Sequence, residues 1–85
     1  MSVRSTLKRY AIEYITGKRN LQDCDVPGVK WSALRRALIV NKKYFEAVKE
    51  DRITKASLLL EKKRAESRFW LETGIRWPKL NDKAV

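Results

Sequence analysis

Apolar residues near the N-terminus recur at the spacing of an amphipathic helix. The positions i, i+3, i+4, i+7 and i+8 of one helical face are occupied by Leu7, Tyr10, Ala11, Tyr14 and Ile15. Ser5 is suited to cap the start of this helix, and Gly17 is suited to end it. The pattern therefore predicts a first helix that buries one stripe of side chains.

A short second helix is predicted directly after the turn at Gly17. Asn20 can cap residues 21–24, and Asp23 would then lie in the positive first turn of that helix. The turn residues 26–28 end it.

A third helix is expected to begin between Lys30 and Ser32 and to run to about Val40. Its buried positions are Val29, Leu34, Ala37 and Leu38. Asn41 is interpreted as a break and as the cap of a fourth helix over 42–48.

The stretch from Arg52 to about Glu72 lacks Gly and Pro and is rich in helix-forming residues, so it predicts one long helix. Residues 58–60 are consecutive leucines, which spread around too wide an arc for one partner. We expect this helix to pack against its own domain on one side and against another chain on the other. Gly74 and Pro78 should break it and leave an extended or frayed tail.

These elements predict an all-α protein with a homeodomain-like helix-turn-helix and a long C-terminal helix. Residues 1–50 would form the DNA-binding domain, 51–73 the long helix with a possible role in self-association, and 74–85 the tail. An all-helical bundle suits a chain of 85 residues, because a single core of this size is only just sufficient for stability.

The net charge of +10 indicates the class of partner that the chain binds. Twenty Lys and Arg residues against ten Asp and Glu favour a polyanionic partner, and the excess is concentrated in residues 1–45. Nucleic acid is the first expectation.

Catalysis and cofactor binding find little support in the sequence. The chain has no His, no Gly-rich phosphate loop and a single cysteine, Cys24, so we expect no enzyme activity, no metal and no cofactor. Neither a signal peptide nor an apolar stretch long enough to span a bilayer is present, which predicts a cytoplasmic protein without a membrane partner.

The third helix is the strongest candidate for reading DNA. Arg35 and Arg36 lie opposite its apolar positions, and neighbouring helical residues point about 100° apart, so the two should divide base and backbone contacts. Trp31 either seals the turn against the core or projects toward the DNA; of the two, we favour the core. Lys30, Ser32 and the helix N-terminus suit phosphate oxygens. Further backbone contacts are expected from Lys18, Arg19, Lys42 and Lys43.

Large apolar residues of the second half are predicted to contact the core, another copy or a partner rather than nucleobases. These candidate contacts are Leu59, Leu60, Phe69, Trp70 and Trp77.

Three segments together resemble the N-terminal helix-turn-helix of tailed-phage terminase small subunits. They are 14–24, with its Gly-containing turn, 27–38, with a Gly-Val entry to an arginine-bearing helix, and 41–48, which is similar to the aromatic-containing F-x-x-A segment just after that helix in the family. The stretch 68–83 is similar to the ending of many members. The resemblance implies recognition of a packaging site on viral DNA, assembly into a ring, and handover to an ATP-driven large subunit.

The sequence thus predicts sequence-specific binding of duplex DNA by a small phage or prophage protein. Two alternatives remain open. A transcription regulator or an excisionase would use the same helix against an operator. A small protein-binding factor would instead direct its charge and its aromatic residues at a host enzyme.

Overall fold

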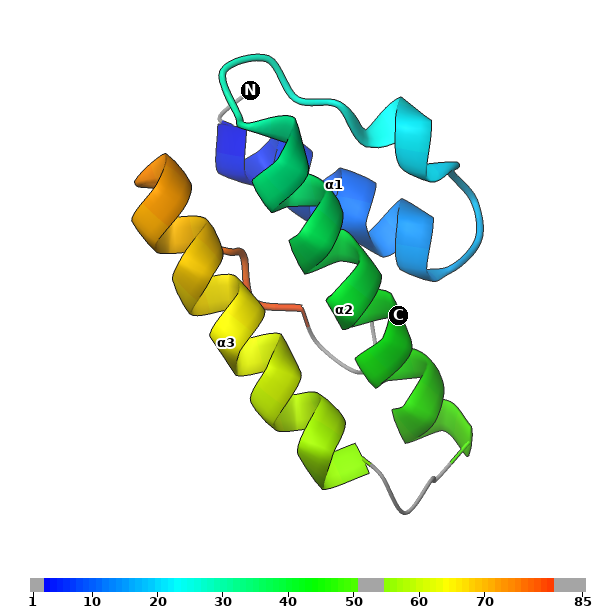
Figure 1. Ribbon diagram of the computed structural model, residues 1–85. Coiled ribbons are helices and arrows are strands. Elements are labelled where there is room, and N and C mark those ends of the chain that lie inside the picture. Colours follow the sequence, from blue (N-terminus) through cyan, green and yellow to red (C-terminus); the bar gives the residue numbers. More distant parts are fainter. Residues whose placement is uncertain (1–2, 51–54, 81–85) are drawn as a thin grey trace.

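The computed structural model describes residues 3–50 and 55–80, and these residues are helical apart from turns and a C-terminal extended segment. The elements are α1 (Val3–Ile15), a single 3₁₀ turn η1 (Leu21–Cys24), α2 (Trp31–Glu50) and α3 (Lys55–Thr73). In Figure 1, α2 and α3 run antiparallel side by side, and α1 crosses α2 on its other side. The prediction of an all-α fold is confirmed for the described residues.

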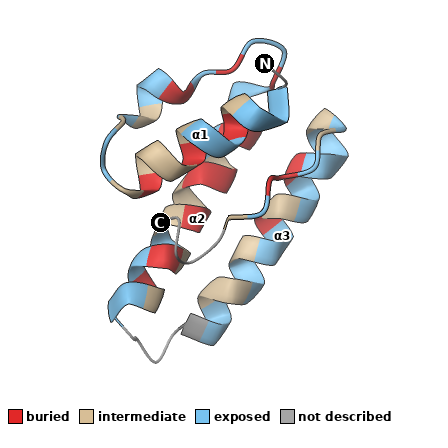
Figure 2. Cartoon of the chain, turned by 180° about the vertical axis from the view of Figure 1, so that it is seen from behind, coloured by how far each residue is buried: buried red, intermediate tan, exposed pale blue. Residues whose placement is uncertain are grey.

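One hydrophobic core lies between the helices, and every α-helix contributes to it. Figure 2 shows buried positions on all three α-helices and on the segments that join and follow them, and α2 contributes more residues to this core than any other element. Leu7 and Ala11 come from α1, Leu34 and Leu38 from α2, and Phe69 from α3. Since α3 supplies Phe69 to this core, α2 and α3 are parts of one packed unit.

Helix α1 follows the predicted stripe, with a different start. Leu7, Ala11 and Ile15 are buried, and the two tyrosines of the stripe are partly buried against the core. Gly17 ends the helical region with a φ of 82°, a conformation that costs glycine little. The predicted cap at Ser5 is wrong, because the helix already begins at Val3 and Ser5 lies within its first turns.

The short second helix exists as a single 3₁₀ turn. Asn20 precedes it in an extended conformation, and its side chain makes no capping hydrogen bond. Residues 25–30 then connect η1 to α2 through a turn in which the Val29 amide donates to the Val26 carbonyl over 3.1 Å. Gly28 has a φ of 84° in this turn.

The predicted break at Asn41 is wrong. Helix α2 continues through this residue to Glu50, so the expected third and fourth helices are one. The Asn41 side chain is fully buried, and its Nδ2 donates to the Ala37 carbonyl over 2.8 Å. Because the amide nitrogen bonds to a carbonyl one turn back in the same helix, the side chain is compatible with a helix interior.

The segment after α3 is extended, as predicted, and 75–80 pack against the core. Gly74 turns the chain with a φ of 73°. The ring of Trp77 meets Phe69 edge to face, with 5.0 Å between ring centroids. Pro78 is also buried. The first part of the tail therefore covers the inner face of α3, and the predicted fraying of 81–85 lies outside the described residues.

A homeodomain-like helix-turn-helix is not confirmed. In such a motif a full helix crosses behind the reading helix and is joined to it by a short turn. Here a single 3₁₀ turn and the connection 25–30 precede α2. The predicted helix start at Arg52 lies outside the described residues.

Candidate nucleic-acid interface

Helix α2 turns its cations outward because its apolar residues occupy the opposite side. Leu34, Ala37, Leu38 and Phe45 are buried at helical spacing. The outward side, called the α2 face below, consists of Lys30, Trp31, Ser32, Arg35, Arg36, Ile39 and Lys43. No Asp or Glu occurs between Lys30 and Phe45, so this part of the helix has no negative side chain of its own.

The start of α2 is open to solvent. Lys30 and Ser32 are exposed, and the Leu34 amide donates to the Lys30 carbonyl over 3.1 Å as the helix begins. The amides that precede Leu34 in the first turn have no carbonyl one turn back, and together with the helix dipole they favour an anion at this end. Two of the predicted phosphate contacts therefore lie where a phosphate can reach them.

Trp31 does not seal the core. It is 37% exposed, and its indole ring lines a shallow hollow of about 470 Å³ on the α2 face. The other residues of this hollow are Ser32, Arg35, Arg36, Ile39 and Val40. The core interpretation of Trp31 is therefore wrong. The reason is that Cys24, Val26 and Val29 already fill the space beneath the connection.

The two adjacent arginines differ in their surroundings, as their directions on the helix require. Arg35 is exposed and has no hydrogen bond or ion pair within 3–50 and 55–80. Arg36 is half-buried beside α3, where its Nη1 lies 3.5 Å from Glu72 Oε2 in an ion pair without a hydrogen bond. Only Arg35 is free to extend toward a ligand.

Glu72 connects the α2 face to α3. Its Oε1 accepts a hydrogen bond from Arg68 Nε over 3.1 Å. This bond, together with the positive charges of Arg36 and Lys30, holds the pKa of the Glu72 carboxyl below its usual value of 4.5, against the opposing effect of desolvation. The carboxylate therefore keeps cations of two helices close together.

Two of the predicted flanking contacts already have partners inside the chain. Arg19 Nε donates to Glu13 Oε2 over 2.7 Å, and its guanidinium lies 4.2 Å from the Tyr10 ring centroid. The hydrogen bond that Arg19 donates to Glu13 raises the pKa of Arg19. Lys42 Nζ lies 4.7 Å from the centroid of Tyr14. Contact with phosphate would compete with these interactions.

Lys18 and Lys43 are exposed and are not engaged in this way within the described part of the chain. Lys43 continues the row of cations on the α2 face, whereas Lys18 lies in the turn after α1. The structure therefore brings Lys43 into the candidate site and leaves Lys18 at its periphery.

The predicted partner contacts of the second half separate into two groups. Phe69 and Trp77 are buried in the core of the chain itself, which is one of the places predicted for them, and they offer little surface to another molecule. Leu59 is partly buried, whereas Leu60 and Trp70 are 51% and 46% exposed. Only the last two offer substantial surface to a partner.

Sequence reasoning missed Arg68 and Glu72. The i, i+4 spacing of these two residues could have indicated their mutual contact. Nothing in the sequence indicates that Arg36 meets Glu72, because the contact depends on how α2 and α3 pack.

Other kinds of site find no support in the described residues. Within 3–50 and 55–80 no group of His, Cys, Asp or Glu side chains could hold a metal ion. Cys24 is buried, and burial raises the pKa of its thiol, so it is not an activated nucleophile. The helices of this part of the chain are also not long and apolar enough to cross a membrane.

Comparison of the chain with protein-family models, with curated proteins and with solved structures found no significant match.

Proposed function

We propose that the chain binds duplex DNA through the α2 face. The observation that carries this proposal is the uninterrupted positive charge from Lys30 to Phe45 on a helix whose opposite side is buried. Glu46 and Glu50 follow only toward the C-terminal end. The distribution of charge therefore favours contact through the N-terminal part of α2, the part that reading helices bring to base edges.

The side chains of the α2 face have complementary roles in such a complex. Lys30, Ser32 and the first amides of the helix suit a phosphate. Arg35, which has no partner among the described residues, can extend to a guanine edge in the major groove. Arg36 is held at the side by Glu72 and suits the backbone. Ile39 and the Trp31 ring can contact thymine methyl groups or sugars.

The biological setting is a further part of the proposal, and it rests on the resemblance to terminase small subunits. Recognition of a packaging site in the cytoplasm of an infected cell requires duplex binding, which the α2 face suits. A phage regulator or an excisionase requires the same surface. A gene for a large ATPase and nuclease immediately downstream would favour packaging, and a divergent promoter would favour regulation.

The test is binding of the purified protein to random-sequence duplex DNA, measured by fluorescence anisotropy at about 50 and about 200 mM salt. We expect binding that weakens steeply with salt. Arg35→Ala should weaken it further, and if Arg35 contacts a phosphate the salt slope should fall by about 1.

Arg9→Ala is the matched control, because Arg9 is an exposed arginine on α1, outside the α2 face. It should leave affinity nearly unchanged, and circular dichroism should show both variants folded. Absence of duplex binding at the lower salt concentration, or equal effects of the two substitutions, would overturn the proposal.

A further inference from the structure

A second cationic surface lies on the outward side of α3 and differs in kind from the α2 face. It consists of Leu60, Lys63, Arg64, Ser67, Arg68 and Leu71, called the α3 strip below, and each of these residues is exposed. Their positions i, i+3, i+4, i+7, i+8 and i+11 are those of a helix face that contacts another element. α3 thus presents one such face to the core and a second to solvent.

The α3 strip is apolar at its ends and positive between them. Leu60 is 51% exposed and Leu71 is 76% exposed, so both ends of the strip present apolar surface to solvent. At 1.5 Å per residue they are about 16 Å apart along the axis. Lys63 and Arg64 lie between them and have no ion-pair partner in the described part of the chain.

The glutamates of α3 lie outside the strip. Two of them form ion pairs within the chain, and the third lies beside the strip. Glu66 pairs with Lys62, with Nζ and Oε2 2.7 Å apart. Glu72 is bound by Arg68 and Arg36. Glu61 is exposed beside the strip rather than on it. The positive charge of Lys63 and Arg64 is therefore available to an outside partner.

The surface of the strip has a depression at Ser67, its smallest residue. Lys63, Arg64, Ser67, Arg68 and Leu71 line a depression of about 470 Å³. Of these, Arg64, Ser67, Arg68 and Leu71 stand at i, i+3, i+4 and i+7. Four residues at this spacing form the hole that accepts one side chain of a facing helix in knobs-into-holes packing.

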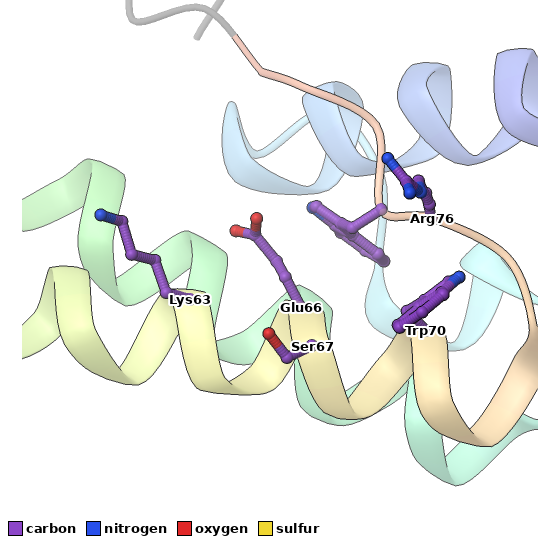
Figure 3. Close-up of a pocket in the computed structure, with 6 residues that line it drawn as sticks. Lys63, Glu66, Ser67, Trp70 and Arg76 are labelled. Carbon is purple, nitrogen blue, oxygen red and sulfur yellow. The ribbon is translucent and has the colours of Figure 1, made fainter.

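A neighbouring hollow extends the strip toward the tail. It measures about 370 Å³ and shares Lys63 and Ser67 with the first. Figure 3 shows Trp70 on α3 next to Arg76 of the tail, and the guanidinium carbon of Arg76 lies 5.8 Å from the centroid of the Trp70 ring. This side of the strip therefore adds an exposed aromatic ring, another cation, and the Glu66 carboxylate, which is paired with Lys62.

From these observations we infer that the α3 strip binds an amphipathic helix of another protein that carries leucine-like side chains flanked by Asp or Glu. The partner's apolar side chains would cover Leu60 and Leu71 and enter the hole at Ser67. Its carboxylates would meet Lys63, Arg64 and Arg68. This inference goes beyond DNA binding and does not depend on it.

The charge of the strip argues against its other occupants. A second copy of the chain, packed through the same strip, would bring Lys63, Arg64 and Arg68 of both copies together, and like charges in contact are destabilising. Nucleic acid would satisfy the cations but would leave exposed leucines at both ends without an apolar surface to cover them. An acidic amphipathic helix satisfies both.

The probe is a synthetic peptide of about 21 residues with leucine at the a and d positions of each heptad and glutamate at e and g. Its binding to the full chain is measured by fluorescence anisotropy. Two peptides serve as comparisons, one with lysine in place of glutamate and one polyglutamate of equal length. We expect the acidic amphipathic peptide to bind at least about tenfold more tightly than either.

The variant that tests the location is Lys63→Glu with Arg64→Glu. Its matched control is Lys8→Glu with Arg9→Glu, an adjacent exposed pair on α1 that changes the net charge equally. The α3 pair should weaken peptide binding by about tenfold or more, and the α1 pair by less than about threefold. Leu71→Ser should weaken it severalfold at high salt, where the apolar contribution remains. Circular dichroism checks that each variant is folded.

Several outcomes would overturn the inference. They are absence of binding by the acidic peptide, equal binding by polyglutamate, and equal effects of the two charge-reversed pairs. Sedimentation that shows a homodimer dissociated by Leu71→Ser would identify a second copy as the occupant instead. If the α3 pair lowered affinity for duplex DNA as much as affinity for the peptide, the strip would belong to a nucleic-acid surface.

Discussion

The α2 face and the α3 strip are both rows of cations, and their apolar surroundings differ. On the α2 face Ile39 is partly buried, and the exposed apolar group is the Trp31 ring at the start of the helix. On α3 the leucines at both ends of the strip stand in solvent. Positive charge alone attracts DNA and acidic proteins alike. The position of the exposed apolar groups, at one end of the α2 face and at both ends of the α3 strip, distinguishes the two surfaces.

The two surfaces also differ in how freely their cations can move. Arg36 is bound to Glu72, and Lys42 rests near the Tyr14 ring, so part of the charge near α2 is held in place. Lys63 and Arg64 have no such partner within the described residues. A surface with fixed charges loses less side-chain entropy on binding, whereas one with free charges adapts to a partner's shape.

The largest expected effect comes from breaking the scaffold that both surfaces share. Phe69→Ala removes a fully buried ring that meets Trp77 edge to face and belongs to the core that α3 shares with α1 and α2. We expect a loss of about 3–5 kcal/mol in the free energy of unfolding, measured by urea denaturation, because a buried aromatic is replaced by a cavity. Both binding activities should fall with the folded fraction.

Phe69→Leu is the control for that substitution, because it retains most of the buried volume and should cost clearly less. If Phe69→Ala unfolded the chain no more easily than Phe69→Leu, the tail and α3 would not be packed as a common core.

A crossed pair of charge reversals should separate the two surfaces. Arg35→Glu with Lys43→Glu is expected to weaken duplex binding by about 100-fold, since two cations become anions on the contacting face. The same variant should leave binding of the acidic peptide within about threefold. Lys63→Glu with Arg64→Glu should show the reverse order. Each variant is titrated with both ligands. Equal losses of affinity for the two ligands would mean that binding depends only on net charge and that the two surfaces are not distinct sites.

A smaller effect is expected at Glu72, which lies where the two surfaces meet. Glu72→Gln removes a negative charge beside Arg36 and Arg68, so affinity for duplex DNA should rise by about two- to fivefold at low salt. Unchanged or weaker duplex binding by this variant would place the DNA away from Glu72.

The pH dependence of stability gives a second measurement on Glu72. Its pKa is lowered in the folded protein, so its carboxylate stabilises the fold at neutral pH, and this contribution is lost as pH falls through the folded pKa, below 4.5. The wild-type protein should therefore exceed Glu72→Gln in stability at pH 7, and the difference should vanish in strong acid. Urea denaturation at both pH values measures it.

The smallest effect is expected from Trp31→Ala. Because the indole is 37% exposed and lies over the surface, its removal should change the free energy of unfolding by only about 0.5 kcal/mol. Duplex binding should fall by about threefold as the apolar contact is lost. A large loss of stability, measured by thermal denaturation, would mean that the ring supports the connection before α2 after all.

The helices themselves were largely predictable from local sequence. The i, i+3, i+4 spacing of Leu7, Ala11 and Ile15 determines which side of α1 is buried, because any helix with this pattern removes the same stripe from water. Gly17 and Gly74 likewise mark the ends of α1 and α3, because both adopt a positive φ that other residues rarely take. The row of cations on α2 is also a property of the sequence once the helix is known.

Local sequence was insufficient wherever a residue's role depended on a distant neighbour. Asn41 is a residue type that often caps helices, yet its Nδ2 donates to the Ala37 carbonyl inside α2, and the helix continues. From the sequence, Trp77 could equally anchor a partner at the surface. In the structure its ring packs against Phe69 and is buried.

By itself, then, the sequence determined an all-helical chain with a strongly basic α2 and a long α3, because periodicity and charge are local properties. Only the tertiary structure decided that Arg36 meets Glu72, that Trp31 is left outside, and that α3 has a second face with exposed leucines. Each of these depends on which surfaces the packed helices cover, and covering is settled by the competition of all apolar side chains for one small core.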